Sequence, residues 1–82
     1  MLRFVEAVKM LVKIEIYNDG ASWCARALAE GIFTQGDTLD ELMENIREAA
    51  SLYFEERLDK GESINLLILY EATLKPRAAK VS

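Results

Sequence analysis

The segment TLDELMENIREAASLYFEER, Thr38–Arg57, decides the fold, because here the apolar residues change from a period of two to helical spacing. Thr38 stands three residues before Glu41, the spacing of a capping box in which each side chain satisfies a free backbone N–H. The apolar positions that follow are Leu39, Leu42, Met43, Ile46, Ala49, Ala50, Tyr53 and Phe54. We predict one long helix from Leu39 to about Arg57, ending before Gly61, with its apolar stripe buried against a sheet.

The residues before this helix predict a three-stranded antiparallel meander. Met10–Tyr17 alternates between apolar and polar side chains, as a half-buried strand does. Asn18-Asp19-Gly20 is a tight-turn signal, so Trp23–Leu28 should form a hairpin with the first strand. Gly31 marks a second turn, and Ile32–Gln35 is predicted as a short third strand.

The residues after the helix predict a last strand, Ile64–Leu74, which should end before Pro76 because proline cannot donate to a sheet ladder. Leu67 and Leu69 fall on the face opposite the other apolar residues, so the middle of this strand is apolar on both sides. Its second face needs cover, from another subunit or from the N-terminal residues Leu2, Phe4, Val5 and Val8. Leu67 and Leu69 are therefore the candidate oligomer interface of a dimer or tetramer.

These elements together predict an α+β fold in the order β-β-β-α-β, an antiparallel sheet with one long helix packed on it. The 82 residues are enough for one domain, with a core at about residues 10–75 and a flexible tail at 76–82. A domain of this size buries only about 60% of the surface that its unfolded chain exposes. Oligomerisation often supplies the missing stability in such cases.

The composition excludes most enzyme classes. The chain has no histidine and one cysteine, Cys24, so it lacks the residues of the common triads and of imidazole acid–base chemistry. One cysteine allows no disulfide within the chain, which suits a reducing compartment. No segment approaches the roughly 20 apolar residues of a membrane helix. We expect a cytoplasmic, non-enzymatic protein without metal or cofactor.

Acidic residues are concentrated in one part of the chain. Residues 37–62 contain nine acids and three bases, a local net charge of −6 where the whole chain carries −4. This excess fits either a solvated helix face or a surface that meets a basic partner and accelerates its association. The candidate partner-binding residues are Tyr17, Glu44, Glu48 and Glu55.

Direct binding of nucleic acid is not expected. Tyr17, Trp23 and Phe33 could in principle stack on bases, but cross-strand packing is the usual role of aromatic residues in a sheet. A chain with a net charge of −4 is repelled by phosphates. The carboxylates also follow a helix face instead of converging at strand ends, so a metal-dependent nuclease is only a distant alternative.

Several short motifs follow one another at a specific spacing. They are Asp19-Gly20, Trp23-Cys24-Ala25-Arg26, Gly31, Gln35-Gly36-Asp37-Thr38-Leu39-Asp40-Glu41, and Asn45-Ile46-Arg47-Glu48-Ala49 with Tyr53. Their order over roughly Val12–Arg57 resembles the HicB-like antitoxin family. One departure is the loop before Gly31, Leu28-Ala29-Glu30, which lacks the family's usual proline.

The resemblance implies a partial RNase-H-like fold that binds and blocks a small, basic mRNA interferase of the HicA type. It also implies a role without catalysis. Many antitoxins of this kind carry an added DNA-binding segment, whereas this sequence ends seven residues after Lys75, so promoter binding is not expected. The alternative function is a structural or regulatory homo-oligomer with no toxin partner.

Overall fold

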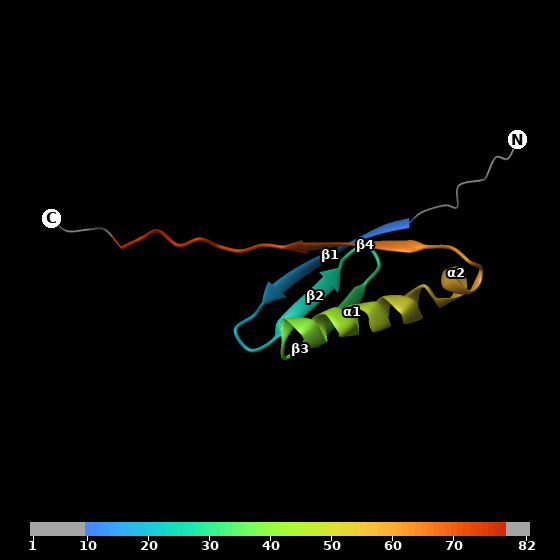
Figure 1. The fold of residues 1–82 in the computed structure, drawn as a ribbon, viewed down its shortest axis with the longest axis horizontal. Coiled ribbons are helices and arrows are strands. Elements are labelled where there is room, and N and C mark those ends of the chain that lie inside the picture. The colour runs from blue at the N-terminus through green and yellow to red at the C-terminus, as the bar shows by residue number, and fades with distance from the viewer. Residues whose placement is uncertain (1–9, 79–82) are drawn as a thin grey trace, which may run out of the picture.

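The computed structural model describes residues 10–78, which form a four-stranded sheet with one long helix on one face (Figure 1). The elements are β1 (Met10–Asn18), β2 (Trp23–Ala27), β3 (Ile32–Gly36), α1 (Leu39–Tyr53), α2 (Glu55–Asp59) and β4 (Ile64–Tyr70). The predicted α+β class and element order are confirmed. The suggested cover by Leu2, Phe4, Val5 and Val8 lies outside the described residues.

The strand order is β3-β2-β1-β4. The β1–β2 and β2–β3 pairs are antiparallel, as the turn signals predicted. The last strand differs from the expectation, because β4 pairs with β1 in parallel, from Met10 opposite Ile64 to Ile16 opposite Tyr70. Helix α1 carries the chain back along the sheet before β4 begins, and such a crossover is what a parallel pair requires. The sheet is therefore mixed.

The two faces of the sheet have different surroundings. On the side of α1, the residues Val12, Ile14, Ile16, Ala25 and Ala27 are buried with Leu42, Ile46, Ala50 and Phe54 of the helical segment. The face turned away from α1, which we call the open face, carries Leu11, Lys13, Glu15 and Tyr17 of β1, Arg26 of β2, Phe33 of β3, and Leu67 and Leu69 of β4. Every one of these side chains is exposed except Tyr17, which is half-buried.

The capping box at the start of α1 is present. The Thr38 Oγ1 atom accepts a hydrogen bond from the Glu41 backbone N–H at 3.0 Å, and the Asp37 backbone N–H donates to Glu41 Oε1 at 2.6 Å. The second bond involves Asp37 instead of Thr38, one residue earlier than in the usual arrangement. Helix α1 therefore begins where the sequence predicted.

The other end of the helix differs from the prediction. Helix α1 stops at Tyr53 and the short α2 follows Phe54, whose φ of −105° and ψ of 27° interrupt the helical geometry. Phe54 continues the row of buried residues Leu42, Ile46 and Ala50 at a spacing of four, and it is 5% exposed. The predicted stop at Gly61 is confirmed, since Gly61 follows α2 with a φ of +89° that other residues rarely adopt.

The predicted strand Ile64–Leu74 is too long. Ladder pairing ends at Tyr70, opposite Ile16, and the last two residues of β1 pair with β2 alone. Beyond it, residues 71–78 have no assigned secondary structure, and Leu74 is 94% exposed. Among residues 10–78, no helix has the length and apolar character needed to cross a membrane.

Candidate functional site

The exposed side of the helical segment carries several acidic side chains. Glu44 and Glu48 are exposed and lie one helical turn apart, on the side of α1 opposite the buried Leu42 and Ile46. Glu55, at the start of α2, is also exposed. We call Glu44, Glu48 and Glu55 the acidic face. Three of the four predicted partner-binding residues thus belong to the helical side of the molecule.

Among the described residues, no carboxylate of the acidic face forms a salt bridge. Within residues 10–78 the ion pairs are Glu15 with Arg26 and Arg57 with Glu62, each at 3.0 Å. Neither pair includes a residue of the acidic face. Like charges one turn apart on a helix repel each other by a few tenths of a kcal/mol, about 0.2–0.5. An incoming cationic side chain would relieve this repulsion.

Two contacts fix the acidic face relative to the sheet. The Asn45 Nδ2 atom donates a hydrogen bond to the backbone carbonyl of Gln35 in β3 at 2.8 Å. At the end of β3, a Cβ atom added to Gly36 would lie 2.7 Å from the backbone nitrogen of Leu42, so the two backbones touch. The unusual mid-helix asparagine therefore ties α1 to the margin of β3.

We predict that Asn45→Ala lowers the free energy of unfolding by about 1 kcal/mol, the usual net contribution of one hydrogen bond. The gain in helix propensity from alanine should offset part of this loss. Urea denaturation followed by circular dichroism measures the change. The matched control is Ser51→Ala, an exposed position on the same helix. A stability of Asn45→Ala equal to that of the control would contradict a structural role for the bond.

Tyr17, the fourth predicted partner-binding residue, lies on the other side of the molecule. It belongs to the open face, where the Arg26 guanidinium lies 4.8 Å from the centre of its ring. The Arg26 Nε atom donates a hydrogen bond to Glu15 at 3.0 Å. This bond, together with the Glu15 charge, raises the pKa of Arg26 above its ordinary value. The structure therefore does not bring Tyr17 together with the acidic face.

The expected packing of the aromatic residues holds only in part. Trp23 packs against the core, and its ring centre lies 5.7 Å from that of Tyr70. Phe33 stands opposite Arg26 of β2 but does not join the core, and it is 58% exposed because odd-numbered residues of β3 point to the open face. Leu67 and Leu69, the predicted oligomer residues, are 40% and 42% exposed on the same face.

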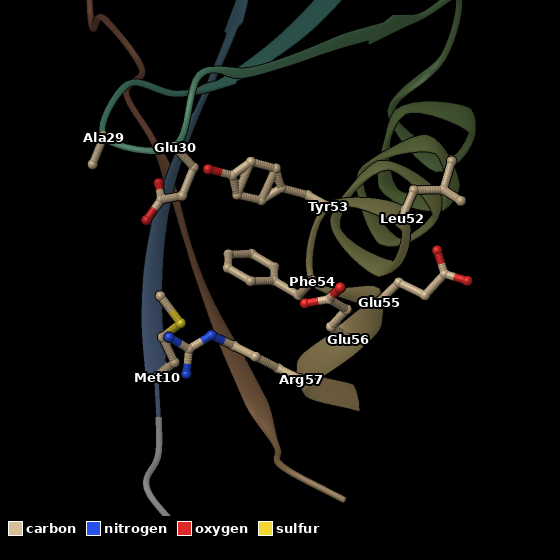
Figure 2. Close-up of a pocket in the computed structure, with 9 residues that line it drawn as sticks. All are labelled: Met10, Ala29, Glu30, Leu52, Tyr53, Phe54, Glu55, Glu56 and Arg57. Atoms are coloured by element: carbon tan, nitrogen blue, oxygen red, sulfur yellow. The ribbon is translucent and has the colours of Figure 1, made fainter. Parts of the chain in front are cut away.

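A depression of about 650 Å³ lies beside the helix break, and the sequence patterns did not indicate it. Figure 2 shows it between the β2–β3 turn, the start of β1 at Met10 and the α1–α2 junction, with Tyr53 pointing toward Glu30. Glu55 and Glu56 also line it, so it adjoins the acidic face. These residues are far apart in the sequence, and only the folded chain brings them together.

Cys24 has the surroundings of a packing residue. It is 1% exposed, and its Sγ atom lies 3.6 Å from Asp19 Oδ2. Burial, with the nearby Asp19 charge, raises the pKa of the Cys24 thiol, so the unreactive protonated form is favoured. Among residues 10–78, no group of three or more potential metal-ligating side chains of Cys, Asp or Glu comes together.

Comparison with known proteins places these features in a family. The sequence profile described as "HicB_like antitoxin of bacterial toxin-antitoxin system" matches residues 27–76. A UPF0150 protein of Thermotoga maritima is 34% identical over 56 residues, which cover 68% of this chain and 80% of that protein. A UPF0150 protein of Archaeoglobus fulgidus is 44% identical over 43 residues, 52% of this chain and 62% of that protein. No solved structure gives a significant match.

Proposed function

Since the chain belongs to the HicB-like antitoxin family, we propose that it is a non-catalytic module that covers a small, basic mRNA-interferase toxin of the HicA type. The observation that carries the proposal is the acidic face. Glu44, Glu48 and Glu55 are exposed and take part in none of the ion pairs within residues 10–78, and Glu44 and Glu48 are carried by α1, which packs on the sheet.

Electrostatic attraction to the acidic face would accelerate association with a basic partner. A region with a local net charge of −6 raises the rate at which a basic protein finds it, because the attraction orients the encounter before contact. The adjoining depression, with Tyr53 beside Glu30, offers a concave place for a protruding side chain of the partner. Tyr17 faces the opposite way, so in this proposal it does not contact a partner seated on α1.

The remaining parts of the proposal follow from composition. The protein acts in the cytoplasm, without a cofactor and without direct contact to nucleic acid or membrane. A net charge of −4 opposes binding to phosphates, and the absence of histidine removes the most common acid–base residue. One cysteine in 82 residues is consistent with a reducing compartment.

The first test is binding to a small basic protein encoded beside this chain. We predict that Glu44→Lys combined with Glu48→Lys weakens that complex at least about tenfold at low salt, because two attractions become repulsions. The difference should shrink as salt is raised, since the screening length falls to about 3 Å at 1 M. Calorimetric titration at several salt concentrations measures both effects.

The matched control is Glu15→Lys combined with Glu71→Lys, which changes the net charge by the same amount away from the outer side of α1 and from the depression. If the two double variants weaken binding equally, total charge and not the acidic face governs association. If no neighbouring basic protein binds the wild-type chain, the proposal of a toxin partner fails.

A second candidate function is a structural or regulatory homo-oligomer, a dimer or tetramer without a toxin partner. The observation that favours it is β4, which exposes Leu67 and Leu69 on the open face. Self-association is measured on the protein alone, so this candidate can be judged separately from toxin binding.

A further inference from the structure

Within the part of the chain that the structure describes, the outer margin of β4 is an unpaired sheet edge. All seven residues of β4 pair with β1 on one side, and within residues 10–78 no strand pairs with the other side. Natural proteins usually protect such an edge with lysine, proline or a bulge, because its free N–H and C=O groups can add another strand. The sequence INLLILY of Ile64–Tyr70 contains neither residue and no charge.

The other edge of the sheet is different. Strand β3 has five residues and packs along α1, and its Gln35 carbonyl already accepts the hydrogen bond from Asn45. Figure 1 shows β4 at the side of the sheet away from α1. The two edges are therefore unequal, and β4 is the one open to strand addition.

Apolar side chains on both faces of β4 are partly exposed, and their burial by another chain would stabilise an assembly. Leu67 and Leu69 are about two-fifths exposed on the open face. On the helix side, Ile64, Leu66 and Ile68 are only half-buried, because α1 packs mainly over β3 and secondarily over β2. Burying apolar surface is favourable by about 25 cal/mol per Å².

We infer that β4 pairs antiparallel with β4 of a second copy, in a register centred on Leu67, to form one continuous eight-stranded sheet. A two-fold axis perpendicular to the sheet keeps each face on its own side, so paired residues must share a face. Centring the register on Leu67 meets this condition and overlaps all seven residues. The pairs are then Leu67 with Leu67, Leu66 with Ile68, Asn65 with Leu69, and Ile64 with Tyr70.

The distribution of charge favours a second copy of this chain, and not a basic protein, as the partner of the β4 edge. Two chains of net charge −4 can meet with least repulsion along an uncharged strand, and a basic partner would find no carboxylate within Ile64–Tyr70. In the eight-stranded sheet the two α1 helices are about six strand spacings apart, or about 29 Å. This distance is several times the screening length of about 8 Å at physiological salt. The acidic faces therefore do not oppose the pairing.

The pairing is independent of toxin binding and leaves it unhindered. Both helices lie on the same side of the extended sheet, with both acidic faces turned to solvent. The dimer would thus present two separate sites, and the loss of either interaction would leave the other measurable.

The test uses the full chain alone, studied by sedimentation velocity over the micromolar range. We predict a dimer for the wild type and dissociation about 100-fold easier for Leu67→Lys and for Leu67→Glu, because each places like charges directly opposite each other. An equimolar mixture of the two variants should restore a dimer, since lysine then faces glutamate. The matched control, Phe33→Lys, changes an exposed residue of the same face at the β3 edge and should remain dimeric.

Circular dichroism checks that each variant is folded. We expect the Leu67 variants to fold, because the Leu67 side chain is exposed. A monomeric wild type would overturn the inference, because the edge would then be covered in another way. A dimeric Leu67→Lys would place the interface elsewhere, as would a monomeric Phe33→Lys. Failure of the two Leu67 variants to associate with each other would overturn the register centred on this residue.

Discussion

Replacing Leu42 by alanine should lower the free energy of unfolding by about 2–5 kcal/mol, the range for removing a buried leucine side chain. Leu42 is 0% exposed and packs with the core residues of β1 and β2. Domains of ordinary size are stable by about 5–15 kcal/mol, and one of 82 residues belongs near the lower limit. Urea denaturation should therefore show a midpoint close to zero denaturant for this variant.

The matched control is Leu52→Ala, the same substitution on the same helix at a position that is 68% exposed. Its effect should stay within about 0.5 kcal/mol, as for most surface substitutions. The comparison separates loss of the core from loss of a leucine in a helix. Equal losses for the two variants would show that the face of α1 at Leu42 does not hold the fold together.

Replacing Gly36 by alanine should cost about 3 kcal/mol, the upper part of the range for adding atoms to a packed site. The new Cβ would lie 2.7 Å from the Leu42 nitrogen and 3.0 Å from the Leu42 Cα. Both are backbone atoms, which cannot rotate away as a side chain can. Gly36 has no positive φ, so the cost comes from the contact alone. Chemical denaturation measures the loss.

A suitable comparison is Gly20→Asn in the β1–β2 turn. Gly20 has a φ of +97°, a region that asparagine tolerates better than most residues, and nothing lies within 4 Å of its added Cβ. We expect a loss of no more than about 1 kcal/mol there. If Gly36→Ala were as stable as Gly20→Asn, α1 could shift away from β3 easily, and the acidic face would be less firmly placed than the contact indicates.

Local patterns predicted the elements well, because they depend on neighbouring residues. The capping residues Thr38 and Glu41 marked the start of α1, and alternation assigned each residue of β1 to a face. The partner of β4 could not be deduced in this way. Alternation shows which side chains share a face but not which strand lies beside them, so the parallel pairing with β1 appeared only in the structure.

The helix break at Phe54 was missed for a related reason. Tyr53 and Phe54 both continue the helical spacing, but adjacent residues on one helix point about 100° apart, so only one can point fully into the core. Phe54 is the buried one, because it continues the row of Leu42, Ile46 and Ala50 at a spacing of four, while Tyr53 stays 53% exposed. This spacing does not mark the break that follows Tyr53.

For the candidate site, too, the sequence predicted which way single side chains point but not which distant segments come together. The outward direction of Glu44 and Glu48 follows from helical spacing, and the position of Tyr17 opposite the core follows from its alternation with Ile16. The depression at Tyr53 and Glu30 could not be predicted, because it depends on how close the β2–β3 turn comes to the α1–α2 junction.

The parallel pairing of β1 with β4 has a consequence for how the protein is made. Met10 of β1 pairs with Ile64 of β4, about 54 positions later in the chain. Strand β4 therefore leaves the ribosome long after β1 does. The hairpins of β1–β3 and helix α1 can assemble from local contacts, whereas closure by β4 requires a long-range step that slows folding. Until Tyr70 has been synthesised, β1 is itself a bare edge, and a nascent chain is open at that strand to proteases and to mispairing.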